Sequence, residues 1–127
     1  MEDFHEQGKN IFVSLKVSYS EFKKGTGRPT LYECTRKYWK INKKKADEAD
    51  YIAGVYKGNV VSIYKIKKGS WKLVSEQSEM MKEKDVKEHP EYESRYSVES
   101  ENGEKEVVEL KSKYPTFRLY GSIGYNY

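Results

Sequence analysis

The strongest structural signal in the chain is a pair of β-rich runs, residues 51–57 and 60–66, on either side of Gly58 and Asn59. Two such runs around a Gly-Asn pair predict a hairpin with a two-residue turn. This turn sets the register through three cross-strand pairs: Lys57 with Val60, Val55 with Ser62, and Ala53 with Tyr64. Both faces of the hairpin are apolar, so we expect it to lie centrally in a sheet that is covered on both sides.

Weaker patterns predict the other elements. Alternation over residues 11–17, with Phe12 on the polar side, predicts a half-buried strand. Residues 71–74 and 96–99 are typical of short strands. Capping residues predict helices over 19–24, 31–39 and 43–49, and residues 80–86 favour a helical turn inside a charged excursion over 75–93. Residues 105–110 fit a helix or a strand, with three side chains directed inward: Val107, Val108 and Leu110.

These elements predict one α+β domain over residues 1–127, because 127 residues suit a single core. The architecture would be a small, mixed, strongly curved β-sheet or barrel with short helices beside it. The C-terminal stretch over 114–127 is rich in aromatic residues and glycines and has one charge, Arg118. We therefore expect it to dock on the body of the domain rather than to fray.

The composition limits the class of protein. Charged residues make up 35% of the chain, and no apolar run has the ~18 residues that a membrane span needs. An aromatic fraction of 14%, with twelve tyrosines, argues against disorder. The first ten residues show no basic region followed by an apolar one, so we expect no signal peptide and a cytoplasmic location.

Positive charge is concentrated in the first part of the chain. Residues 1–74 carry sixteen Lys or Arg and eight Asp or Glu, a net charge of +8, whereas residues 75–127 have a net charge of −4. A segregated basic part favours an anionic partner such as nucleic acid or a nucleotide. The alternative is that a lysine-rich chain distributes its charges over any solvated face.

The residues needed for catalysis are sparse. His5 and His89 are the two histidines, and neither lies near a nucleophile motif. We expect Cys34, the single cysteine, to be an inert buried thiol in the middle of a helix. The chain has no phosphate-binding loop and no metal-ligand spacing. The sequence therefore predicts a protein that is not an enzyme and has no metal or cofactor.

The candidate ligand site is an aromatic and arginine stripe. On helical spacing, Tyr32, Arg36 and Trp39 share one face of the helix predicted over 31–39. Arginine offers a planar fork of donors for a phosphate or a base edge, and aromatic rings stack on bases. The remaining candidates would contribute phosphate contacts or, for the tyrosine, a further ring: Arg28, Lys40, Lys43, Lys44 and Tyr56. The alternative is that Trp39 is a core anchor and that Arg36 stacks on it or pairs with an acid.

A longer pattern resembles a known family. The string Leu31-Tyr32-Glu33-x-Thr35-Arg36-x-x-Trp39 is followed by Ala49-x-Tyr51, by Val55-Tyr56-x-Gly58 and by Trp71. This order is similar to the core of a family of small bacterial and phage proteins of uncharacterised function. Arg95-Tyr96-Ser97-Val98 and the degraded stretch over 121–127 resemble two later motifs of that family. The resemblance covers most of residues 30–127 and implies no assigned chemistry.

At the level of the fold, the predicted order of elements resembles the PUA-like domains, which include the EVE, ASCH and YTH modules. That resemblance implies a curved mixed barrel that binds RNA or a modified base in an aromatic pocket.

Two functions follow from these observations. The first is a non-catalytic binding module for a nucleotide or a nucleic-acid base. The alternative is a phage-type inhibitor or sequestering protein that acts on a host defence protein, because the twelve acidic residues of segment 76–109 can mimic phosphate. Neither function involves a membrane, and the oligomeric state is left open.

Overall fold

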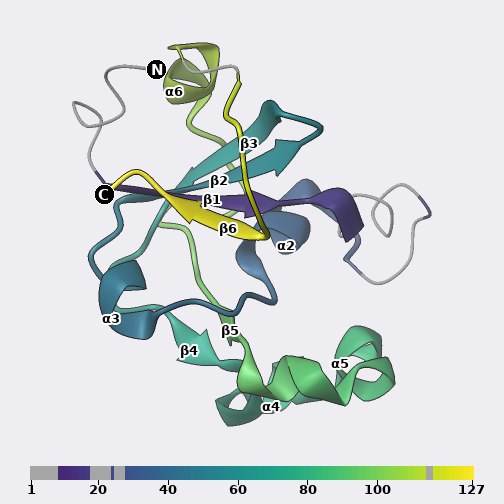
Figure 1. Cartoon of the computed structure of the whole chain (residues 1–127). Helices are drawn as coiled ribbons and strands as arrows, with labels where there is room; N and C mark the ends of the chain where they lie inside the picture. Colours follow the sequence, from purple (N-terminus) through teal and green to yellow (C-terminus); the bar gives the residue numbers. More distant parts are fainter. Residues whose placement is uncertain (1–8, 18–23, 25–27, 114–115) are drawn as a thin grey trace.

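The computed structural model describes residues 9–17, 24, 28–113 and 116–127 and contains an open four-stranded sheet (Figure 1). The strand order is β3-β2-β1-β6. β1 (Asn10–Ser14) runs parallel to β2 (Tyr51–Tyr56), while β3 (Asn59–Lys65) and β6 (Ile123–Tyr125) run antiparallel to their neighbours. The predicted α+β class with a mixed sheet and short helices is confirmed. The sheet has β3 and β6 at its edges, so the expected closure into a barrel is not confirmed.

β1 is buried on both faces, not on one. Ile11, Val13 and Leu15 pack toward the larger core, and Phe12 packs toward the opposite face, with no exposed surface at any of the four. The expectation of a half-buried strand over 11–17 was wrong because β1 lies inside the sheet. It ends at Ser14, and Lys16 and Val17 are exposed.

The hairpin forms, but its register differs from the predicted one. The two turn residues are Lys57 and Gly58, with φ of 51° and 80°, and not Gly58 and Asn59. Two consecutive residues with positive φ give the twist that a two-residue hairpin needs. The observed pairs are Tyr56 with Asn59, Val55 with Val60, Gly54 with Ser62, and Ala53 with Ile63.

An irregularity between Gly54 and Val55 shifts the register by one residue beyond the Val55–Val60 pair. A bulge changes which side chains share a face. It allows Val60 and Ile63 to join the same buried cluster, while Tyr64 joins the cluster on the opposite face. The predicted pairing would have placed Tyr64 beside Ala53. The prediction that both faces are covered is confirmed, although, of the two hairpin strands, β3 lies at the edge of the sheet and β2 lies inside it.

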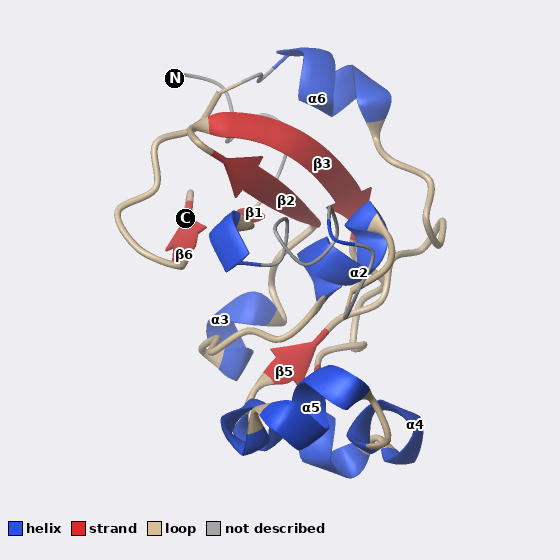
Figure 2. Ribbon diagram, turned by 90° about the vertical axis from the view of Figure 1, so that its right-hand side faces the viewer, coloured by secondary structure: helices blue, strands red, loops and turns tan. Residues whose placement is uncertain are grey.

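Helices cover the two faces of the sheet unequally (Figures 1 and 2). α2 (Leu31–Arg36) and α3 (Lys43–Ala46) lie against the face that carries the larger core. α6 (Val108–Lys113) lies on the opposite side, where Val107, Phe117 and Leu119 pack on the smaller core. Val107 is thus directed inward as predicted, but Val108 is 65% exposed because it begins the helix on its solvent side.

The helix starts agree better with the sequence than the helix ends. The Thr30 side chain accepts the Glu33 N–H at 3.1 Å, and the Asn42 side chain accepts the Lys45 N–H at 3.1 Å, as caps do. α2 nevertheless stops at Arg36. Trp39 instead exchanges two backbone hydrogen bonds with Tyr96, each 2.9 Å long, so pairing with a distant strand replaces the last helical turn.

The charged excursion folds into a separate helical layer below the sheet (Figure 1). β4 (Lys72–Leu73) pairs with β5 (Tyr96–Ser97). Both strands lie within the short strands predicted over 71–74 and 96–99. Between them lie four short helices: η2 (Val74–Glu76), α4 (Ser78–Met81), α5 (Lys84–Glu88) and η3 (Pro90–Ser94). A third buried cluster holds this layer together, and it consists of Tyr38, Val74, Met80, Val86 and Tyr92.

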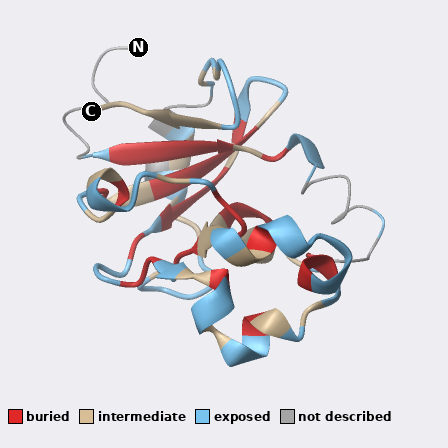
Figure 3. Ribbon diagram, turned by 60° about the horizontal axis from the view of Figure 1, so that its bottom comes forward, coloured by how far each residue is buried: buried red, intermediate tan, exposed pale blue. Residues whose placement is uncertain are grey.

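The tail docks as expected, because β6 pairs with β1 through Ile11 with Tyr125, Phe12 with Gly124 and Val13 with Ile123. Figure 3 shows the buried residues gathered on the central strands and on the inner sides of the helices. The helix expected over 19–24 falls mainly on residues outside the described part. Within the described ranges, no helix has the length and apolar character to cross a bilayer.

Gly54 lies where β2 packs closely against Leu15 and Ser62. A Cβ there would lie 2.6 Å from Leu15 Cδ1 and would also clash with Ser62 Oγ, which hydrogen-bonds the buried Thr35 hydroxyl at 2.7 Å. We predict that Gly54→Ala lowers the free energy of unfolding in urea by about 2 kcal/mol, because overpacking forces neighbours to shift. Gly121→Ala, where no atom lies within 4 Å of the new Cβ, is the matched control and should change it little. Equal stability of the two variants would contradict this packing.

Candidate ligand-binding pocket

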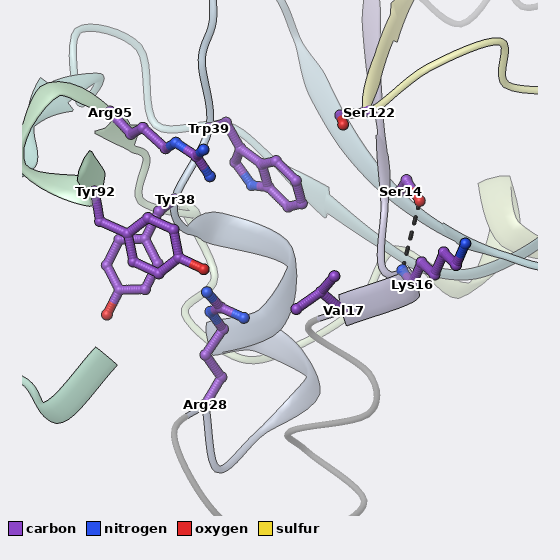
Figure 4. A pocket seen from close by; sticks show the side chains of 9 residues that line it. All are labelled: Ser14, Lys16, Val17, Arg28, Tyr38, Trp39, Tyr92, Arg95 and Ser122. Carbon is purple, nitrogen blue, oxygen red and sulfur yellow. Dashed lines mark hydrogen bonds between the residues drawn. The ribbon is translucent and has the colours of Figure 1, made fainter. Parts of the chain in front are cut away.

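Five stretches of the chain line a hollow beside the end of β1 (Figure 4). Ser14 donates its backbone N–H to the Ser122 carbonyl at 2.8 Å, which fixes the entry to β6 beside the end of β1. The extended segment after α2 and the helical layer supply the other walls. The hollow measures about 200 Å³ and is lined by Ser14, Lys16, Val17, Arg28, Tyr38, Trp39, Tyr92, Arg95 and Ser122.

A second hollow of about 210 Å³ adjoins the first. The two share Tyr38, Trp39, Arg95 and Ser122, and the second extends toward Lys40 and Ile123. Together they form a single recess between the sheet and the helical layer, which we name the aromatic pocket.

Aromatic rings form the rigid wall of the aromatic pocket. The Tyr38 and Tyr92 rings stack with their centroids 4.7 Å apart and their planes 18° apart. Trp39 is 7% exposed, and its indole Nε1 donates to the Thr35 carbonyl at 2.8 Å. Because the ring nitrogen is bonded to the end of α2, the indole keeps one orientation and presents a flat surface at the pocket.

Arg28 lies against the same tyrosines on the far side of the pocket. Its guanidinium carbon is 4.9 Å from the Tyr38 centroid and 5.5 Å from the Tyr92 centroid. Asp85 of α5 pairs with it at 3.6 Å, and the two side chains are only 5% and 10% exposed. A buried guanidinium with a nearby carboxylate joins the helical layer to the segment that precedes α2.

Arg95 is the second guanidinium group in the lining of the aromatic pocket. Its guanidinium carbon lies 4.8 Å from the Tyr92 centroid, and Figure 4 shows the group directed toward Trp39. No carboxylate among the described residues lies within ion-pair distance of it. Lys16 and Lys40 are exposed at the rim and also lack an acidic partner within the described part of the chain. Among the described residues, the lining of the aromatic pocket therefore contains four cations, Lys16, Arg28, Lys40 and Arg95, and no carboxylate.

A buried polar network behind the aromatic pocket holds Tyr38 in place. Lys37 pairs with Glu33 at 2.6 Å and with Glu83 at 2.8 Å, and Glu83 also accepts a hydrogen bond from the Tyr38 hydroxyl. Burial, followed by this hydrogen bond, raises the pKa of Tyr38, so the phenol stays protonated. Burial opposes ionisation of Glu33, but Lys37 and Arg36 outweigh it and lower the pKa of Glu33.

The structure separates the residues of the predicted helical stripe. Trp39, Arg28 and Lys40 line the aromatic pocket. Arg36 instead donates from Nε to the Val98 carbonyl at 2.9 Å and from Nη1 to Glu33 at 3.1 Å, and the Tyr32 hydroxyl accepts the Ser100 N–H at 3.0 Å. These two residues anchor the strand segment around Val98.

The remaining predicted residues lie elsewhere. Lys43 and Lys44 are exposed on α3, where Lys43 pairs with Asp47 at 2.9 Å. Tyr56 is half-buried at the hairpin end and packs against the larger core, with Lys57 Nζ 5.4 Å from its ring centroid.

The sequence did not single out Tyr38, Tyr92, Arg95 and Ser122 as pocket residues. Tyr38 falls inside the helix predicted over 31–39, and the other three lie elsewhere along the chain. Their approach depends on the pairing of Trp39 with Tyr96 and of β1 with β6, which no local pattern indicates. The nearest signal was the adjacent Arg95-Tyr96 motif.

Cys34 and His89 lie outside the lining of the aromatic pocket. Cys34 is fully buried, as predicted, and burial raises its pKa to about 11. His89 is exposed and lies 3.6 Å from Glu91. In the described ranges, no group of three or more His, Cys, Asp or Glu residues could hold a metal ion. No protein-family model, curated protein or solved structure matches the chain.

The network behind the pocket generates a pH-dependent prediction. Glu33→Gln should lower the free energy of unfolding at neutral pH by about 1–3 kcal/mol, because it removes a charged partner of the buried Lys37. Because the pKa of Glu33 in the folded state lies below the unfolded value of 4.5, this difference is present above pH 4.5 and disappears as acid protonates the folded carboxylate. Urea unfolding across pH measures it.

The control is Glu79→Gln, which removes a 90% exposed carboxylate located 3.6 Å from Lys82 and should leave stability unchanged. If the difference in free energy of unfolding between Glu33→Gln and the original protein does not shrink on acidification, the ion pair is not the source of that difference.

Proposed function

We propose that the protein is a non-catalytic binding module for a nucleotide or a nucleic-acid base, and that the aromatic pocket is its site. The observation that carries this proposal is the convergence of flat aromatic surfaces with two guanidinium groups, of which Arg95 has no acidic partner among the described residues. A flat ring system with an attached anion matches both features.

Each wall of the aromatic pocket supplies a different contact. The fixed indole of Trp39 offers a surface for stacking, which typically contributes ~1–3 kcal/mol per base. Arg95, supported on the Tyr92 ring at 4.8 Å, offers a fork of N–H donors to a phosphate. The hydroxyl of Ser122 lines both hollows and can bond a sugar or base edge.

The chemistry of the lining favours binding over catalysis. Among the described residues that line the two hollows, none is a histidine, a cysteine or a carboxylate. Such groups usually supply the nucleophile or the general base of an active site. We therefore propose a protein that holds its ligand without altering it.

The acidic segment 76–109 supports the alternative inhibitory function less well. Glu79 and Glu88 lie 3.6 Å and 3.7 Å from Lys82 and Lys84 of the same helical layer. Neighbouring opposite charges of this kind weaken the resemblance to a row of phosphates. We therefore propose the pocket, and not this segment, as the functional surface.

The proposal is tested by titrating the protein with AMP, GMP, CMP and UMP while recording tryptophan fluorescence. We expect at least one nucleotide to change the emission of Trp39, and we expect Trp39→Phe, which retains the 2% exposed Trp71, to remove the change. Arg95→Ala should weaken binding roughly tenfold or more, because a hydrogen bond to a charged group contributes about 1.5–3 kcal/mol.

Arg118→Ala is the matched control, because Arg118 lies 5.4 Å from the Tyr120 ring in a similar arrangement but outside the pocket lining. An absence of any fluorescence change, or an equal loss of affinity in Arg95→Ala and Arg118→Ala, would refute the proposed function.

A further inference from the structure

We propose that the physiological ligand is a single-stranded nucleic acid, whose backbone leaves the aromatic pocket along a track of lysines formed by Lys40 and the α3 residues Lys44 and Lys45. This inference rests on the proposed function, since it places one base of the strand in the aromatic pocket. It adds that the flanking phosphates contact the lysine track, whose α3 members Lys44 and Lys45 lie outside the lining of the pocket.

The lysine track begins at the wall of the pocket. Lys40 and Ile123 border the second hollow, and Lys40 is exposed. Tyr125 lies two residues beyond Ile123 on β6, so both project from the same face of the strand. The Tyr125 hydroxyl accepts the Asn42 N–H at 3.4 Å, at the start of α3. The pocket, β6 and α3 are thus joined by direct contacts.

Lys45 is held in position by two aromatic rings. Its Nζ lies 4.5 Å from the Tyr125 centroid and 5.5 Å from the Tyr127 centroid. The Tyr127 hydroxyl donates to the Lys45 carbonyl at 2.5 Å, and the two tyrosine rings meet edge to face at 5.6 Å. A lysine packed on rings loses less side-chain freedom when it binds a phosphate, because part of that freedom is already lost in the folded protein.

The charges around α3 divide into neutralised and free groups. Lys43 pairs with Asp47 at 2.9 Å, Lys9 with Glu48 at 2.6 Å, and Lys68 with Asp50 at 3.0 Å. Lys40, Lys44 and Lys45 have no carboxylate within ion-pair distance in the part of the chain that the structure describes. Lys40 borders the pocket and Lys44 and Lys45 lie on the adjacent α3, so these three are the cations near the pocket that remain available for phosphates.

A single strand fits this arrangement better than a duplex. A base must be unstacked and unpaired before it can enter the recess beside Trp39. The flanking backbone can then follow a row of cations, which is the usual design of proteins that bind single strands.

The test compares a fluorescein-labelled single-stranded RNA of mixed sequence with its duplex and with the four mononucleotides. We expect the single strand to bind more tightly than either, with an affinity that falls steeply with salt. The double variant Lys44→Gln/Lys45→Gln, which leaves the pocket lining intact, should lower the slope of log affinity against log salt by about 1.4, at roughly 0.7 for each phosphate that the protein no longer neutralises. Its response to mononucleotides in the Trp39 fluorescence assay should not change.

The matched control is Lys43→Gln/Lys68→Gln, which removes two lysines that are paired with aspartates. Equal slopes for the two double variants would overturn the lysine track, as would a duplex that binds as tightly as the single strand. Either result leaves the mononucleotide response intact, so it is distinguishable from a failure of the proposed function, in which Trp39 responds to no mononucleotide.

Discussion

The burial of β1 between β2 and β6 is the constraint on which the rest of the structure depends. Ile11, Phe12, Val13 and Leu15 are completely buried, so this strand has side chains in the cores on both faces of the sheet. Its backbone pairs in parallel with β2 and antiparallel with β6, elements that lie some forty and more than a hundred residues further along the chain. A strand buried on both faces has no solvent side, and slipping by one residue would exchange its two sets of apolar side chains.

The aromatic pocket is a consequence of that pairing. β1 ends where β6 begins, and the Ser14 to Ser122 hydrogen bond closes one wall. The other wall belongs to a helical layer that contacts the body through the Trp39–Tyr96 bridge, the buried Arg28–Asp85 pair and the Lys37 network. Buried ion pairs contribute little net stability but are costly to break, so they fix the position of the layer relative to the sheet. Because the recess lies between the sheet and this fixed layer, its cations are already oriented before a ligand binds.

Local patterns in the sequence predicted the secondary-structure elements more accurately than they predicted the site. The hairpin, the caps at Thr30 and Asn42 and the docked tail could be predicted because turns, caps and apolar runs are properties of neighbouring residues. The hairpin register could not, because the bulge near Gly54 depends on which face each side chain meets in the folded core. The helical stripe failed for a related reason: Trp39 leaves the helix to pair with Tyr96, and Arg36 turns to the Val98 carbonyl.

By itself, the sequence determined that the chain has an α+β fold with a basic first part and that an indole and a nearby arginine are candidates for a flat anionic ligand. The tertiary structure decided which arginines share a recess with that indole. Arg28 and Arg95 lie on opposite sides of the aromatic pocket, and Tyr92 contacts both guanidinium groups although Arg28 is more than sixty residues away in sequence. The physical reason is that periodicity reports only neighbours along one element, whereas a pocket is lined by residues that strand pairing and buried charges bring together.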